Sequence, residues 1–235
     1  MNTDRYQLLA ALVRAFFDAY TSGIIDSAEA TSGDKRTPKN VKQILLNHYE
    51  SIAPAFFEDL FFPLAAMNFS YEEIEKIVRQ AQQQGDNMQA LVHRACGSEA
   101  LYEAMVAEYR RNFSALLGGS CPTVAEHLQT YTRGEATEPF DTDRAIELTT
   151  RVVMHAYARG LRAAGEKAPH FRQVTLYRLL LDAMNVLCLD HVADFSDCQD
   201  DLTAMFVKVC GSPHGFSVMT QEMDRTHHEI IGWEA

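Results

Sequence analysis

Hydrophobic side chains recur every three or four positions along almost the whole chain, which is the period of an amphipathic helix. In the first stretch these positions are Tyr6, Leu9, Leu12, Val13, Phe16, Phe17 and Tyr20. No segment shows the apolar–polar alternation that is typical of a half-buried strand. The pattern therefore predicts an all-α fold, a single-domain irregular bundle of about eight to ten helices.

Capping residues predict where many of these helices begin and end. Thr37-Pro38 is typical of a helix start, and Ser70-x-x-Glu73 and Thr123-x-x-Glu126 match the capping box. We expect a short helix over residues 87–95, and Ser98 caps the long helix that follows it. Glycines that follow the last apolar position predict helix ends at Gly23, Gly85, Gly118 and Gly165.

Other segments are less regular. Residues 26–37 are polar without an apolar anchor, so we expect a mobile loop there. Pro54 and Pro169 should each begin a helix, and Pro63 should kink or end one. One apolar stripe continues from Tyr177 to Val209, and we expect a break near residues 190–197, where Ser196-x-x-Gln199 resembles a capping box. Residues 134–141 are the best candidate for an internal domain boundary, although an ordinary interhelical loop has the same length.

The composition restricts the class of protein. Of the 235 residues, 47% are hydrophobic and 23% are charged, which is average for a globular domain. The net charge is −11 and the pI is about 5.2. Nucleic-acid binding needs a basic surface, so we expect no nucleic-acid partner.

The expected compartment is the cytoplasm. The first 25 residues contain Asp4, Arg5, Arg14 and Asp18, which argues against a signal peptide. The longest stretch without charged residues, 112–125, is too short to span a bilayer, so we expect no membrane partner. The five cysteines include no C-x-x-C pair, and we interpret them as reduced, mostly buried thiols.

No catalytic signature is present: the chain has no G-x-G-x-x-G, P-loop, G-x-S-x-G or H-E-x-x-H. Two sets of residues have the spacing of a metal site. Asp224, His227 and His228 lie three and four positions apart, so they could share an ion, or they could form a polar helix end. Asp190, Asp194, Asp197 and Asp201 would align on an unbroken helix as a magnesium site, but a solvated helix face gives the same pattern. The sequence identifies no cofactor.

Charge is unevenly distributed along the chain. Residues 144–178 carry seven basic and two acidic side chains, whereas residues 179–235 carry ten acidic and two basic ones. Arg151, Arg159 and Arg162 share one side of a helix, which favours an anionic ligand, an acidic partner, or neutralisation by the acidic C-terminal elements, either within the chain or across a dimer. His155 should be exposed and paired in this row. His191 lies within an apolar stripe, where it is either a buried core residue or a ligand contact.

Two classes of function remain. The first is a non-enzymatic protein that acts through protein–protein interaction, as a regulator, adaptor or self-associating subunit. The second is a helical enzyme or sensor with a small-molecule or metal pocket between helices, which would require His191, or Asp224, His227 and His228, to point into a cavity. We also expect a homodimer, because one helix cannot direct Phe56, Phe57, Phe61 and Phe62 to a single face.

Overall fold

A computed structural model describes residues 4–32, 38–116, 118, 140–166, 169–187, 195–198 and 201–232. Within these residues the chain forms ten helices and no strand, and helices make up 85% of them. The all-α prediction is therefore confirmed. The proposed domain boundary at 134–141 lies almost entirely outside the described residues.

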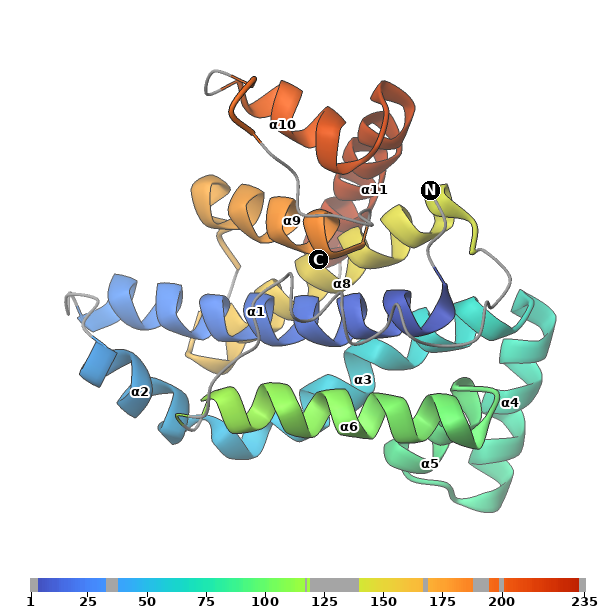
Figure 1. Ribbon diagram of the computed structural model, residues 1–235. Coiled ribbons are helices and arrows are strands. Elements are labelled where there is room, and N and C mark those ends of the chain that lie inside the picture. Colours follow the sequence, from blue (N-terminus) through green and yellow to red (C-terminus); the bar gives the residue numbers. More distant parts are fainter. Residues whose placement is uncertain are drawn as a thin grey trace.

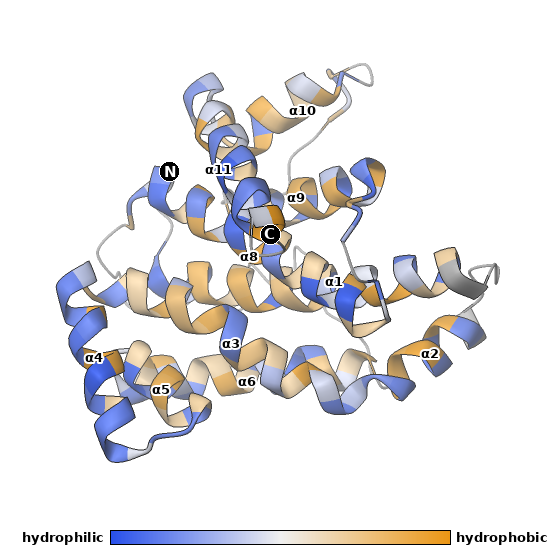
Figure 2. Cartoon of the chain, turned by 180° about the vertical axis from the view of Figure 1, so that it is seen from behind, coloured by the Kyte–Doolittle hydropathy of each residue, from blue (hydrophilic) through white to orange (hydrophobic). Residues whose placement is uncertain are grey.

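The helices in chain order are α1 (Arg5–Ser32), α2 (Pro38–Asn47), α3 (Tyr49–Asn68), α4 (Tyr71–Gln84), α5 (Met88–Ala95), α6 (Glu99–Leu116), α8 (Thr142–Ala163), α9 (Gln173–Leu187), α10 (Leu202–Val209) and α11 (Pro213–Gly232). The two central helices are α1 and α8, which pack more extensively on each other than any other pair does. Helices α2 to α6 lie on one side of this pair, and α9 to α11 lie on the other (Figure 1). The apolar colouring gathers on the inner helices, whereas α4 is mostly polar (Figure 2).

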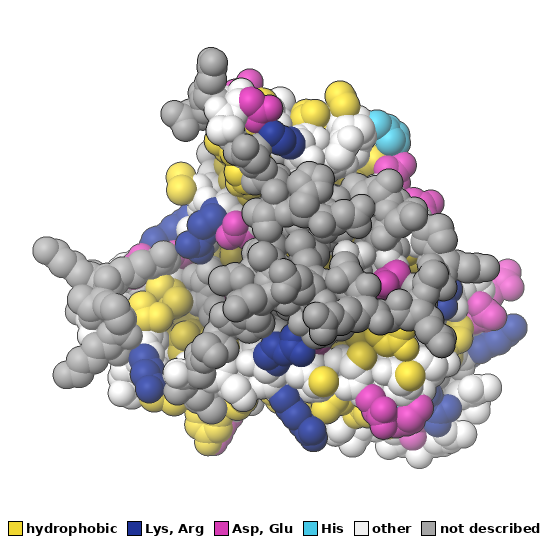
Figure 3. All heavy atoms as spheres, in the orientation of Figure 1, with side chains coloured by type: hydrophobic (Ala, Val, Ile, Leu, Met, Phe, Trp, Pro, Cys, Tyr) yellow, Lys and Arg dark blue, Asp and Glu magenta, His cyan; other side chains and the backbone are white. Residues whose placement is uncertain are grey.

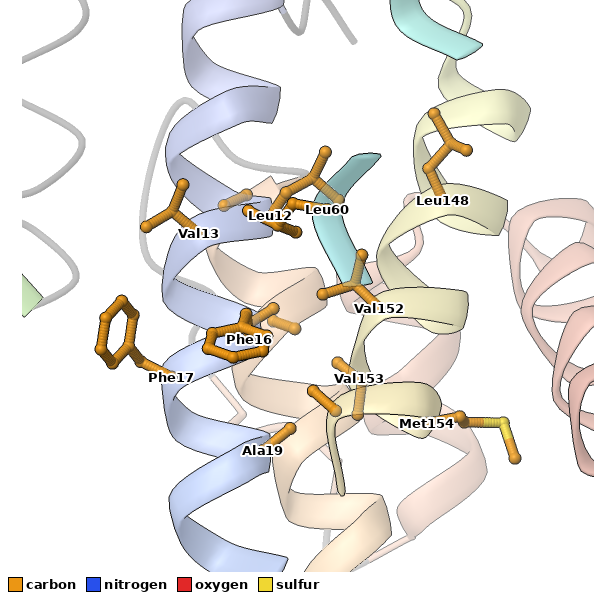
Figure 4. Packing of buried hydrophobic residues seen from close by; sticks show 14 of the residues in the cluster. Leu12, Val13, Phe16, Phe17, Ala19, Leu60, Leu148, Val152, Val153 and Met154 are labelled. Carbon is orange, nitrogen blue, oxygen red and sulfur yellow. The ribbon is translucent and has the colours of Figure 1, made fainter. Parts of the chain in front are cut away.

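The α1–α8 contact is close because two glycines face the backbone of the opposite helix. A Cβ atom at Gly160 would lie 2.1 Å from the carbonyl oxygen of Tyr20, and one at Gly23 would lie 2.3 Å from that of Tyr157. Beside this contact, Phe16 of α1 and Val152 and Val153 of α8 turn toward each other, whereas Met154 points away from α1 (Figure 4). The lack of side chains at both glycines therefore sets how near the two central helices come.

The prediction that Gly23 ends the first helix is wrong, because α1 continues to Ser32. Gly23 lies inside the helix, where its small size serves the contact with α8. The loop expected from residue 26 onward is also wrong as far as Ser32, and residues 33–37 lie outside the described residues. Asp26 is fully buried and accepts a hydrogen bond of 2.5 Å from Tyr157 Oη. A distant partner on α8 thus anchors a segment that looks polar and unanchored in sequence.

The prediction for Pro54 is wrong as well, and Pro63 does not end its helix. Both prolines lie inside α3, which neither begins at the first nor ends at the second. A proline in a helix interior costs about 3 kcal/mol. However, α3 buries Ile52, Phe56, Leu60 and Leu64 almost completely, and these positions extend across both prolines. Tertiary burial therefore outweighs the local cost.

The capping predictions are more accurate. Ser70 and Glu73 form the capping box of α4, and Gly85 follows it with φ of 70°. Asn87 caps α5, Ser98 accepts a hydrogen bond at the start of α6, and α2 begins at Pro38. The capping box at Thr123 lies outside the described residues.

Two details of the C-terminal half differ from prediction. Helix α9 begins at Gln173 rather than at Pro169. The break in the long stripe exists, but α10 begins after Asp201, which caps it in place of Ser196.

One described stretch, Arg5–Ala30 in α1, is long and apolar enough to cross a membrane by length and composition. In the fold, 83% of its most apolar window is buried against the other helices. The core helix of a soluble protein meets the same criterion, so the observation is weak evidence for a membrane span.

Candidate functional site

Two of the three predicted arginines line one pocket between α3 and α8, which we call the α3–α8 pocket. It has a volume of about 260 Å³. Its walls are Glu58, Asp59, Phe62, Pro63, Arg151, Val152, His155 and Arg159. Arg151, His155 and Arg159 lie one helical turn apart, so the spacing noted in the sequence does bring them to one face of α8.

Arg159 joins α8 to α3 through two carboxylates. Its guanidinium lies 2.8 Å from Asp59 Oδ1 and 2.5 Å from Glu58 Oε2. The Asp59 side chain is only 4% exposed, and Oδ2 has no hydrogen-bond partner among the described residues. Burial raises the pKa of Asp59 to about 6, although Arg159 acts in the opposite direction. This carboxyl is therefore partly protonated just below neutral pH.

Arg151 and Arg162 turn toward α11. Arg151 contacts Glu229 at 2.5 Å and Glu222 at 3.5 Å, and its guanidinium lies over the ring of Phe62, 5.5 Å from the centroid. Arg162 donates to the backbone oxygen of Ile230 at 3.4 Å, away from the α3–α8 pocket. Of the alternatives for this basic row, the structure supports neutralisation within the chain, by α11 and also by α3.

His155 does not follow the prediction that it is exposed. Its side chain is 19% exposed, and its Nε2 lies 3.9 Å from Glu229 Oε2. Burial is the main cause that lowers the pKa of His155 to about 4, and the neighbouring Arg151 adds to the shift. The imidazole is therefore neutral at pH 7. The sequence predicted that His155 is exposed because Val152 and Val153 occupy the side of α8 that faces α1. However, α3 and α11 cover the side of α8 on which His155 lies.

A carboxyl and a neutral imidazole with displaced pKa values resemble an acid–base pair, and such groups cluster at functional sites. Structural ion-pair networks displace pKa values in the same way. Here Arg159 already pairs with Asp59 Oδ1 and with Glu58, and no cysteine, serine or lysine is among the described residues that line the pocket. The arrangement is a polar clamp between α3 and α8.

The predicted metal residues lead to a second and larger pocket, which we call the α9–α11 pocket. It has a volume of about 430 Å³ and lies beside α8, against the side from which Met154 projects. Its walls are Met154, Pro169, His170, Phe171, Gln173, Leu176, Tyr177, Met223, Asp224, His227 and Ile231. Asp224 and His227, one turn apart on α11, therefore face one cavity, together with His170 from the segment before α9.

The third predicted residue does not join them. His228 is exposed, and its Nδ1 donates to the backbone oxygen of Asp224 at 2.7 Å, within its own helix. Among the described residues, no group of three His, Cys, Asp or Glu side chains is placed to hold a metal ion. His191, Asp190 and Asp194 lie outside the described residues. Asp197 pairs with Lys208, and Asp201 caps α10, so these two serve local structure.

The features that suggested a dimer have partners within the chain. Phe56 is fully buried against Phe16, Phe17, Phe57 and Tyr109, and Phe62 lies under Arg151. Phe57 and Phe61 are half-buried against the same core. On the face seen in Figure 3, basic and acidic side chains are interspersed among the coloured residues. Neither the phenylalanines nor the charges thus require a second subunit.

Sequence reasoning missed several residues at these sites. Glu58 and Asp59 precede Arg159 by about 100 positions, and nothing in the sequence connects them. His170 lies just before α9, and Tyr177 lies within it. Nothing in the sequence shows that both line one cavity, because that cavity forms only where several helices pack together. Comparison of the chain with protein-family models, with characterised proteins and with solved structures found no match.

Proposed function

We propose that the protein binds a small, mainly apolar molecule in the α9–α11 pocket. The observation that carries the proposal is that Asp224 and His227, selected by spacing alone, line a cavity whose other walls are largely apolar. A volume of about 430 Å³ falls in the range of roughly 300–1,000 Å³ for ligand pockets. Met154, Leu176 and Met223 supply apolar contact, while His170, Asp224 and His227 supply polar groups.

Binding, rather than catalysis, is the favoured role. The described walls contain no nucleophile paired with a base, and the sequence carries no catalytic signature. Methionine side chains such as Met154 and Met223 adapt to ligands of different shape. A sensor or carrier of small apolar molecules fits these features best.

The test exploits two adjacent histidines. His227 and His228 are both exposed on α11, but only His227 lines the pocket. Titration with N-phenyl-1-naphthylamine, a neutral fluorescent probe, should give saturable binding at one site. His227→Trp fills the pocket and should weaken binding at least tenfold, whereas His228→Trp should leave it within twofold. Absence of saturable binding, or equal effects of the two variants, would contradict the proposal.

Protein–protein interaction is the second candidate, and one observation favours it. Val174 is 85% exposed and Ile231 is 48% exposed, and both lie at or next to the same pocket. Exposed apolar side chains around a pocket suit the docking of a partner side chain, including one from a second copy. Light scattering at micromolar concentration tests self-association: a mass of 26.4 kDa at every concentration would exclude the homodimer.

A cytosolic location belongs to this proposal. Cys96, Cys198 and Cys210 are buried free thiols, and Cys121 and Cys188 lie outside the described residues. Burial raises the pKa of Cys96 and Cys210 to about 12, which leaves both thiols unreactive. Thiol titration of the native protein should therefore find these two protected, and a native disulfide would argue for an oxidising compartment.

A further inference from the structure

A second cavity adjoins the α9–α11 pocket. It has a volume of about 270 Å³ and lies between α9, α10 and α11. Tyr177, Met223 and Asp224 belong to the walls of both cavities, so these residues mark the junction. We call the two cavities together the joined pocket.

The charge of the joined pocket is one-sided. Asp224 is the only carboxylate in its described walls, and no lysine or arginine lines either part. The Asp224 side chain makes no ion pair among the described residues, since its neighbour Arg225 pairs with Glu222. A ligand that enters would therefore meet one uncompensated negative charge.

Aromatic rings line the same cavity as this carboxylate. Tyr177 and Phe206 meet edge to face with ring centroids 6.1 Å apart, and Phe206 stacks on Phe216 at 6.0 Å. These three residues line the second cavity. Aromatic faces attract organic cations through the ring quadrupole, and they also accept apolar groups. A carboxylate among aromatic rings is the combination that recognises an ammonium group on an apolar body.

We infer that the joined pocket takes an organic cation, a protonated amine with an apolar body. Its ammonium group would lie at Asp224, and its body would extend along Met223 and the aromatic rings. The net charge of −11 raises the concentration of cations near the surface and acts in the same direction. This inference rests on the proposed function and adds the charge of the ligand.

The test uses three ligands that share one body: 2-(1-naphthyl)ethylamine, 2-(1-naphthyl)ethanol and 1-naphthylacetic acid. Calorimetric titration at pH 7 and low salt should give the amine an affinity about five- to tenfold above that of the alcohol, with the acid weakest. This range suits a partly exposed ion pair with an aromatic contribution. Asp224→Asn should remove the preference for the amine and leave the affinity for the alcohol within twofold.

Glu72→Gln is the matched control. It removes the same charge from an exposed position on α4, distant from the joined pocket, and should retain the preference. If the three ligands bind equally, or if Asp224→Asn retains the preference, the inference fails while the proposed function stands. If none of the three binds, the proposed function fails as well.

Discussion

Helix α8 meets α1 and α3 in opposite ways. Toward α1 it presents Gly160, and the two backbones approach with no side chain between them. Toward α3 it presents Arg159, which reaches Glu58 and Asp59 through a long side chain. The first contact depends on shape and the second on charge. One helix is therefore held in place by two kinds of contact that are lost under different conditions. Added side-chain volume would disrupt the contact with α1, and a change of protonation would weaken the contact with α3.

The largest effect should come from Gly160→Ala. The new methyl group would lie 2.1 Å from a backbone oxygen of α1, and no side-chain rotation relieves that clash. Overpacking usually costs about 1–3 kcal/mol when side chains can move. Here the helices themselves must separate, so we expect the free energy of unfolding to fall by more than about 4 kcal/mol. Urea unfolding followed by circular dichroism measures it.

Gly232→Ala is the control, because nothing lies within 4 Å of a Cβ atom added there. Alanine is favoured over glycine in helices by up to about 1 kcal/mol, so this variant should be neutral or slightly stabilising. A Gly160→Ala protein as stable as the Gly232→Ala protein would show that the α1–α8 contact is not limited by shape.

A smaller loss should follow from Arg159→Met, which removes the partner of the buried Asp59 carboxyl. Breaking a buried pair costs roughly 3–5 kcal/mol. Because Asp59 can take up a proton, we expect about 3 kcal/mol at pH 7.5 and clearly less at pH 5. Arg144→Met removes an exposed pair with Glu147 and should cost about 1 kcal/mol or less at both pH values. Equal losses for the two variants would contradict the clamp.

The pH dependence should be the subtlest effect, because two residues oppose each other. The pKa of Asp59 is raised to about 6, so the folded state binds more protons and stability falls as pH rises from about 4 to 6. The pKa of His155 is lowered to about 4, so the unfolded state binds more protons and stability rises with pH from about 4 to 6.5. Each contribution amounts to about 3 kcal/mol, and in the wild type they nearly cancel.

Single variants should separate the two contributions. The free energy of unfolding of Asp59→Asn should increase as the pH rises from 4.5 to 6.5. That of His155→Gln should decrease over the same rise in pH. Chemical unfolding at the two pH values measures both slopes. If the slopes of both variants match that of the wild type, these two groups do not determine the pH response of the clamp.

The sequence predicts local structure better than long-range contact. The fold class and the caps at Ser70 and Ser98 follow from residues within four positions of each other. The predictions for Gly23 and Pro54 were wrong because the roles of these residues depend on α8 and on the core, which lie far away in the sequence. Helix propensity reflects only a residue and its neighbours in the sequence. Tertiary packing overrides it where side chains are completely buried.

The candidate site shows the same division. Helical spacing correctly placed Arg151 with Arg159, and Asp224 with His227, on shared faces. The acidic residues that pair with the arginines lie on α3 and α11, and no pattern in the neighbouring sequence predicts this pairing. The cavities themselves exist only where three helices meet, so the joined pocket could not be predicted from any single segment.

The central pairing also constrains how the chain is made. Between the end of α1 and the start of α8 lie about 110 residues, and a ribosome that adds roughly 5–20 residues per second needs roughly 5–20 s to supply them. During that interval α1, whose apolar side chains are mostly buried in the fold, lacks its main partner. The nascent chain should therefore attract chaperones that capture apolar segments. Stalled chains that end before residue 142 should bind such chaperones and be cut readily by protease, whereas released full-length protein should resist both.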